Sequence, residues 1–142
     1  MKSKNTKING LKVISGKNHY DSRGFFKEIY VKKKFKNHKP IFWCMSKSKK
    51  NVLRGLHLQT KNSQEKFVSV IKGKILDVIV DLRKKSKTFG KHFKIILSEK
   101  NAKSVLIPSG CAHGFLGLDK ENIVLYSNNK YRSKKSETGL IW

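Results

Sequence analysis

Acidic residues are scarce in this sequence. Its 142 residues include nine Asp and Glu against 33 Lys and Arg, which gives a formal net charge of +24. Such a balance first suggests nucleic-acid binding. Only four of the basic residues are arginine, however, whereas phosphate and base recognition favour the bidentate guanidinium group. The lysines are spread from Lys2 to Lys135, as on a solvated surface, so we do not expect nucleic acid as the principal partner.

Cysteine is also rare. Cys44 and Cys111 have no paired spacing that would form a metal or redox motif, so we expect reduced structural thiols. No apolar run approaches membrane-spanning length, and the basic stretch from Met1 to Leu11 lacks the apolar segment of a signal peptide. We therefore expect a cytoplasmic protein without a membrane partner, folded as a single domain over residues 1–142.

Long apolar stripes with the 3.6-residue period of a helix are missing as well. Short β-branched or aromatic runs alternate with polar turns instead, which predicts many strands and few helices. Strands at this spacing predict an all-β sandwich or barrel. The expected strands are 68–71, 75–82, 93–97, 104–107, 115–118 and 123–127, with a tight turn or bend at Lys72-Gly73-Lys74.

Two aspartates lie on one of these predicted strands. Alternation places Asp77 and Asp81 on the face shared by Ile75 and Ile79, and an acid on an apolar face needs a partner. A structural ion pair and a role in a functional site both remain open for Asp77.

Other residues are expected to have structural or surface roles. The lysine runs at 32–34 and 47–50 are typical of exposed loops or strand edges. Three histidines in polar, lysine-rich surroundings are expected at the surface, and two tryptophans as core or interface anchors: His19, His38 and His92, and Trp43 and Trp142.

Two segments combine features that neither core packing nor solubility explains. The first is Arg54-Gly55-Leu56-His57-Leu58-Gln59, followed by Lys66 and Gly73. The second is Pro108-Ser109-Gly110-Cys111-Ala112-His113-Gly114-Phe115. Together they resemble the two motifs of the cupin barrel, which implies an all-β double-stranded β-helix, or jelly-roll barrel, with both motifs lining one cavity.

The chain departs from the metal-binding cupins at two positions. Gln59 stands where those proteins have a second histidine, and Lys66 stands where they have a glutamate. An ammonium group beside a divalent ion is unfavourable, and transition metals prefer imidazole, thiolate or carboxylate ligands. We therefore predict no catalytic metal and no cofactor.

A metal-free cavity with Arg54, His57, Lys66 and His113 suits a substrate that is anionic or becomes so during reaction. Proton abstraction next to a ketone fits, because a histidine accepts a proton at neutral pH. Lys66 and Arg54 supply positive charge for the resulting enolate oxygen. Inversion of the carbon then needs an acid on the opposite face, for which a tyrosine late in the barrel is suitable.

The chain also resembles the dTDP-4-dehydrorhamnose 3,5-epimerase family over nearly all of its length. The resemblance implies a homodimer that epimerises C3, C5 or both of a 4-keto-6-deoxy sugar linked to dTDP or GDP, in deoxysugar and polysaccharide biosynthesis. The matching segments occur in the same order as in the family: 21–28, 46–48 with 52–59, 66–68, 77–83, 86–90, 107–115 and 137–142.

The resemblance also implies roles for individual residues. His57 would be the general base, Tyr126 the acid on the opposite face, and Lys66 the charge that stabilises the enolate. The segment from Arg23 to Glu28 would complete the neighbouring protomer's site. The remaining matches are to substrate-binding positions: Arg54 and His113 at the sugar and diphosphate, Arg23, Phe26, Glu28 and Glu137 at the nucleotide, and Gln59 at the substrate.

One departure from the family concerns the base. It is usually oriented by an aspartate beyond the final Gly-x-x-Trp match, and this sequence ends at Trp142. We hypothesise that Asp77 or a backbone carbonyl orients His57 instead, or that the enzyme is weaker or catalyses fewer steps.

Further departures lie in the binding strands. Phe42 and Cys44 stand where the family has Gln and Asn before the Ser-x-Ser pair, which leaves the preference for a particular nucleotide base open. A later family tyrosine falls at Arg132, with Tyr131 one place early, so either a register shift restores it or the pocket differs.

Three alternatives to the epimerase remain. One is a catalytically inactive cupin that binds a nucleotide sugar or glycan. Another is a nucleotide-4-keto-sugar 3,4-ketoisomerase, a group that typically has another histidine in place of Gln59. Nucleic-acid binding through the lysine surface ranks last.

Overall fold

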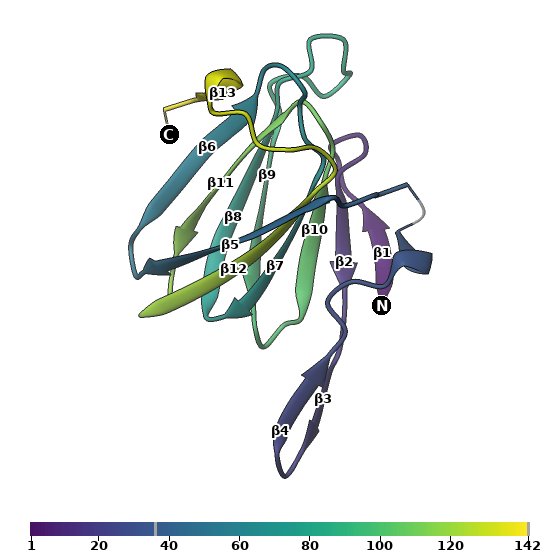
Figure 1. Ribbon diagram of the computed structural model, residues 1–142, viewed down its shortest axis with the longest axis vertical. Helices are drawn as coiled ribbons and strands as arrows, with labels where there is room; N and C mark the ends of the chain where they lie inside the picture. Colours follow the sequence, from purple (N-terminus) through teal and green to yellow (C-terminus); the bar gives the residue numbers. More distant parts are fainter. Residues whose placement is uncertain (36, 142) are drawn as a thin grey trace.

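The computed structural model describes residues 1–35 and 37–141, and strands make up most of it (Figure 1). Two short 3-10 turns, η1 (Lys32–Lys34) and η2 (Lys134–Ser136), interrupt the strands. The strands are β1 (Lys2–Asn5), β2 (Lys12–Ser15), β3 (Asn18–Asp21), β4 (Gly24–Lys27), β5 (Phe42–Lys49), β6 (Leu53–Gln59), β7 (Lys66–Lys72), β8 (Lys74–Asp81), β9 (His92–Ser98), β10 (Lys103–Ile107), β11 (Cys111–Gly117), β12 (Glu121–Asn128) and β13 (Glu137–Gly139).

Two antiparallel sheets form the body of the molecule (Figure 1). Within the described residues, one sheet has the strand order β1-β2-β10-β7-β12-β5 and the other has the order β13-β6-β11-β8-β9. The chain crosses between them at Gly73, because β7 pairs with β10 and β12 whereas β8 pairs with β9 and β11. The predicted jelly-roll fold class is therefore confirmed.

The hydrophobic core lies between the two sheets. Val68 and Val70 of β7 belong to the same buried cluster as Ile75 and Ile79 of β8 and Phe115 of β11. A second cluster under η1 contains Phe35 and Phe67. The polar pocket described below opens beside this core, between β5, β12, β6 and β11, and Phe115 belongs to both.

Strands β3 and β4 form a hairpin that projects away from the two sheets (Figure 1). Its aromatic side chains Tyr20, Phe25 and Phe26 are exposed. Arg23, at its tip, binds Asp21 at 2.7 Å. The hairpin thus presents apolar and cationic groups away from the body of its own chain.

The predicted strands are all present, and Gly73 is at the predicted bend. The expected strands did not include β1 to β6 or β13, and β11 begins at Cys111 rather than near Phe115. Its glycine-containing, polar start has the composition of a turn, but it pairs continuously with β8 from Cys111 to Gly117. As predicted, Asp77 and Asp81 share the buried face of β8 with Ile75 and Ile79.

The surface predictions hold for most of the residues. His19 and His92 are exposed, as are the η1 lysines. Trp43, expected as a core or interface anchor, is 44% exposed and so is not a core residue. The prediction for His38 is wrong, because its side chain is buried between Glu65 and Ser127 and bonds to both. Trp142 lies outside the described residues. In the part of the chain that the structure covers, neither helical turn has the length or apolar character to traverse a bilayer.

Candidate active site

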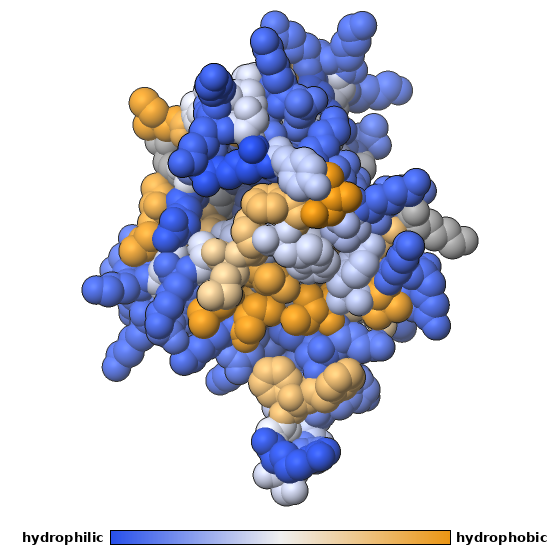
Figure 2. Space-filling view, in the orientation of Figure 1, coloured by the Kyte–Doolittle hydropathy of each residue, from blue (hydrophilic) through white to orange (hydrophobic). Residues whose placement is uncertain are grey.

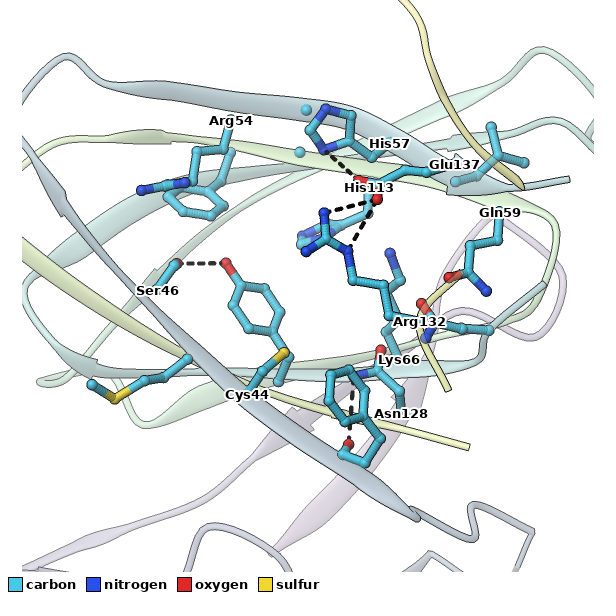
Figure 3. Close-up of a pocket in the computed structure, with 18 of the residues that line it drawn as sticks. Cys44, Ser46, Arg54, His57, Gln59, Lys66, His113, Asn128, Arg132 and Glu137 are labelled. Atoms are coloured by element: carbon cyan, nitrogen blue, oxygen red, sulfur yellow. Dashed lines mark hydrogen bonds and ion pairs between the residues drawn. The ribbon is translucent and has the colours of Figure 1, made fainter. Parts of the chain in front are cut away.

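A pocket of about 590 Å³ opens between the two sheets (Figure 3). One wall comes from β6 and β11 and the other from β5, β7 and β12, while Arg132 and Glu137 close one side. The sequence-predicted residues that line it are Arg54, His57, Gln59, Lys66, His113, Tyr126 and Glu137. Residues far apart in the sequence therefore meet in one cavity.

His57 and His113 are directly opposite each other on β6 and β11. Directly opposed residues of an antiparallel pair project from the same face, so both rings reach the pocket. Gly55 permits the close approach of these strands, because a Cβ atom there would lie 2.5 Å from the His113 carbonyl oxygen. The side chain of His57 is 54% exposed, whereas that of His113 is buried.

Asp77 does not take the predicted place beside His57. Its Oδ1 accepts a hydrogen bond from His113 Nε2 at 2.6 Å, and its Oδ2 has no hydrogen-bond partner within the described residues. The hypothesis that Asp77 orients His57 is therefore wrong. The reason is that β8 pairs with β11 in a register that places Asp77 opposite Phe115 and diagonal to His113, whereas β6, which carries His57, lies on the other side of β11.

Tyr126 comes from the opposite sheet and hydrogen-bonds through its hydroxyl to Ser46 Oγ at 2.8 Å. Its ring meets that of His113 edge to face, with the centroids 6.3 Å apart. Burial raises the pKa of the Tyr126 phenol well above its usual value, the hydrogen bond to Ser46 opposes this, and the charge of Asp77 adds to it. The phenol therefore keeps its proton at neutral pH, as a general acid must.

Cationic groups gather around the same pocket. Burial lowers the pKa of the Lys66 ammonium group, an effect opposed by the negative charge of Glu137. Arg54 Nε donates to Ser48 Oγ at 2.8 Å, and its Nη2 donates to the Lys47 carbonyl oxygen at 3.2 Å. Positive charge thus faces the cavity from β6 and from β7, as an anionic substrate requires.

Arg132 is a pocket residue that sequence reasoning noted only as a departure from the family. It lines the cavity and donates from Nε and Nη2 to Glu137 Oε2. Tyr131 is 71% exposed, so a register shift does not restore the family's tyrosine and the pocket differs here. The sequence signal for this residue was that Arg132 stands where the family has a tyrosine. Arg132 adds a third cation to Arg54 and Lys66 in this cavity.

Gln59 has a structural task in addition to lining the pocket. Its amide nitrogen donates to the carbonyl oxygens of Asn62 and Tyr131, and its Oε1 accepts from the Ser133 amide at 2.6 Å. These bonds hold the segment that carries Arg132 against β6. The predicted contact of Gln59 with substrate stays a prediction.

The residues at the other two departures also line the cavity. Phe42 and Cys44 belong to the β5 wall, where neither side chain offers an amide to a ligand. Burial raises the pKa of the Cys44 thiol, which therefore stays protonated at neutral pH. The β5 wall is thus largely uncharged.

The predicted nucleotide-binding residues Arg23, Phe26 and Glu28 lie on or beside the projecting hairpin and are exposed, outside the pocket of their own chain. Arg23 pairs with Asp21 rather than with Glu28. In the described part of the chain no group of three or more His, Cys, Asp or Glu is placed to hold a metal ion. The prediction of no metal and no cofactor stays a prediction.

The comparison with known sequences gives one family. The family profile described as dTDP-4-dehydrorhamnose 3,5-epimerase matches residues 5–142. The enzyme of that name from Salmonella typhimurium is 40% identical over 143 residues, which cover 96% of this chain and 78% of that protein. Its counterpart from Methanothermobacter thermautotrophicus is 38% identical, with coverage of 96% and 76%.

Solved structures give the same result. The dTDP-4-dehydrorhamnose 3,5-epimerase of Bacillus anthracis, with TDP and PPi bound, superposes with a TM-score of 0.93 at 37% identity, covering 99% of this chain and 84% of that one. The dTDP-6-deoxy-D-glucose-3,5-epimerase of Legionella pneumophila, in complex with dTDP-4-keto-L-rhamnose, also has a TM-score of 0.93, at 38% identity and coverage of 98% and 77%. With this fold, this pocket and these matches, the chain belongs to the dTDP-4-dehydrorhamnose 3,5-epimerase family, a family of isomerases.

Proposed function

We propose that this protein inverts C3, C5 or both of a dTDP-linked 4-keto-6-deoxy sugar by removing a proton on one face of the carbon and returning one on the other. One observation carries the proposal: His57 and Tyr126 line the same pocket from opposite sheets. A sugar ring between them has a base on one side and an acid on the other. Inversion needs this arrangement, because both groups act on the same carbon.

The proposed reaction begins at His57, which takes the proton next to the 4-keto group. The electrons move onto the ketone oxygen, and the positive charge of Lys66 stabilises the resulting enolate. Tyr126 then donates its phenolic proton to the opposite face and regains a proton from solvent, while His57 releases the proton that it took to solvent. The raised pKa of the Tyr126 phenol supports its role as the acid, since the phenol is protonated before this step begins.

The proposed substrate carries dTDP rather than GDP. The support comes from relatives, because the Bacillus anthracis structure holds TDP and the Legionella pneumophila structure holds dTDP-4-keto-L-rhamnose. In this chain, Arg54 is the cation proposed to bind the diphosphate. Phe42 and Cys44 lie in the β5 wall at positions where the family has amide side chains. The preference for one nucleotide base over another is therefore measured separately.

We also propose that the protein is a homodimer in which each β3–β4 hairpin completes the partner's pocket. Phe26 is 67% exposed on that hairpin, and Met45 is 67% exposed on β5, an edge strand of its sheet. Figure 2 shows apolar side chains gathered in the middle of this face and on the hairpin, surrounded by hydrophilic ones. Exposed apolar surface beside an unpaired edge favours a covering partner, and a second copy supplies one.

The proposed location is the cytoplasm. Cys44 and Cys111 are both free thiols, which fits a reducing compartment.

The test of the proposed function follows deuterium by NMR. The protein is incubated in heavy water with a 4-keto-6-deoxy sugar on dTDP, and in parallel with one on GDP. Deuterium at C3 or C5 with inversion on the dTDP carrier supports the proposal. Measurable binding without exchange on either carrier would instead support the inactive-binder alternative.

Two variants separate the base from the acid. His57→Asn is expected to slow exchange by about 100-fold or more, the usual contribution of a general base. Tyr126→Phe is expected to retain exchange, because His57 can return a deuteron to the same face, but to lose inversion. Inversion by Tyr126→Phe at the wild-type rate would show that another group is the acid.

A further inference from the structure

Arg132, Glu137 and His57 form a line of ionisable groups along one side of the pocket (Figure 3). Glu137 Oε1 lies 3.9 Å from His57 Nδ1. Its other oxygen, Oε2, accepts hydrogen bonds from Arg132 Nη2 at 2.9 Å and from Arg132 Nε at 3.1 Å. The carboxylate therefore uses one oxygen for the arginine and turns the other toward the histidine.

The backbone fixes this arrangement. Strand β13 pairs with β6 in a register that places Glu137 opposite Gln59 and Gly139 opposite His57. A Cβ atom at Gly139 would lie 3.1 Å from the Leu56 carbonyl oxygen and 3.4 Å from His57 Cδ2. Glycine at this position lets β13 lie directly against the imidazole ring.

We propose that Glu137 is the residue that positions His57, and that Arg132 holds Glu137 in place for this task. The inference rests on the proposed function, in which His57 is the base. With Nδ1 turned toward the carboxylate, Nε2 is left to accept the substrate's proton. The role differs from the nucleotide contact that the family resemblance implies for Glu137.

The distance indicates when Glu137 acts. At 3.9 Å the contact is longer than a hydrogen bond, so while His57 is neutral the carboxylate acts on it through its charge alone, which favours the tautomer with the proton on Nδ1. Once His57 has taken a proton, the imidazolium and the carboxylate attract each other, which stabilises the state that proton abstraction creates. Arg132 and Lys66 both face the same carboxylate, so its negative charge is shared with two cations.

The test compares Glu137→Gln, Arg132→Gln and Arg132→Lys with the wild type. The matched control is Glu121→Gln, since Glu121 lies outside this pocket and pairs with Lys47 and Lys72. The measurements are kcat and KM for solvent exchange into the dTDP-linked keto sugar, the Kd for dTDP by calorimetry, and the His57 tautomer by nitrogen-15 NMR.

Glu137→Gln is expected to lower kcat for exchange by about 10-fold to 100-fold, the range typical of residues that orient a functional histidine. The Kd for dTDP should change by less than about twofold, because a positioning residue acts on the step and not on nucleotide binding. The His57 nitrogen-15 signals should show a redistributed tautomer. Arg132→Gln should lower kcat in the same direction, with partial rescue in Arg132→Lys.

Wild-type kcat in Glu137→Gln, or a loss explained entirely by weaker dTDP binding, would overturn the inference. An unchanged His57 tautomer would do the same. If the wild type does not catalyse deuterium exchange into the keto sugar, the proposed function is wrong. The tautomer measurement still decides whether Glu137 orients the His57 ring.

Discussion

Asp77 Oδ1 and His113 Nε2 are 2.6 Å apart, and both side chains are buried. The second oxygen of Asp77 has no hydrogen-bond partner among residues 1–35 and 37–141. A buried carboxylate with one partner is costly to keep in a core. Because this carboxylate bonds to a pocket histidine, we predict that it fixes the His113 ring, which is proposed to bind the sugar.

Asp77→Asn tests that task. An amide keeps the shape but removes the charge, so His113 is held less firmly, and we expect kcat to fall by about 10-fold to 100-fold. The affinity for dTDP should stay near the wild-type value, because Asp77 does not line the pocket. Steady-state exchange kinetics and calorimetry measure the two effects. If kcat is unchanged in Asp77→Asn, Asp77 contributes only to the stability of the fold.

Asp81 lies on the same buried face of β8 but is fully paired. The side chain of Arg83 is the main cause of its strongly lowered pKa, and Ser86 and Thr88 add to it. Because the folded pKa lies below the unfolded value of about 3.9, the stabilisation is present above that pH and is lost as the pH falls below it. The free energy of unfolding should therefore decrease below about pH 4.

The measurement is urea denaturation at several pH values between 7 and 3, with Asp81→Asn beside the wild type. The variant should be less stable at neutral pH and should lose less stability on acidification, while keeping its exchange kcat. Equal acid sensitivity in both proteins would mean that other carboxylates cause the loss.

Much of the fold follows from local sequence patterns. The period-two alternation in β8 predicts which face of the strand carries Asp77 and Asp81, and the Lys72-Gly73-Lys74 bend is visible as a break between two apolar runs. The motifs around His57 and His113 indicated one cavity, and both residues line it.

Partner choice could not be predicted in the same way, because it depends on strands that are distant in sequence. His38 sits among lysines in the chain, yet it bonds to Glu65 and Ser127, 27 and 89 residues away. Asp77 meets His113 rather than His57 because of the β8–β11 register. The contact between Glu137 and His57 likewise requires β13 to pair with β6.

Lys66 gives a prediction for alkaline pH. Burial lowers the pKa of its ammonium group, so the positive charge at the enolate is lost at a lower pH than for an ordinary lysine. Turnover should decline as the pH rises through that value. In Lys66→Arg the guanidinium stays charged, so the decline should move to higher pH even though kcat is lower.

The control is Lys66→Met, which removes the charge and should reduce kcat by about 100-fold to 1,000-fold at neutral pH. The pH profile of kcat between 7 and 10.5 distinguishes these cases. If kcat declines at the same alkaline pH in the wild type and in Lys66→Arg, a group other than Lys66 causes the decline.

If the projecting hairpin completes the partner's pocket, we predict that two inactive variants complement each other in a mixed dimer. His57→Asn disables the base, and a double change of Arg23→Ala with Glu28→Ala disables the hairpin, whose polar side chains are exposed. If each hairpin completes the partner's pocket, a mixed dimer has one intact site, formed by the body of the hairpin variant and the hairpin of the His57→Asn chain. Random mixing in equal amounts should then restore about a quarter of the wild-type sites.

The measurement is exchange activity after the two variants are mixed under conditions that allow subunits to exchange. Each variant alone should be nearly inactive, and a mixture kept from exchanging subunits serves as the control. If each hairpin served its own chain, the mixed dimer would contain no intact site, because one chain lacks the base and the other lacks its hairpin contacts. Recovery after subunit exchange therefore separates a shared site from a self-contained one.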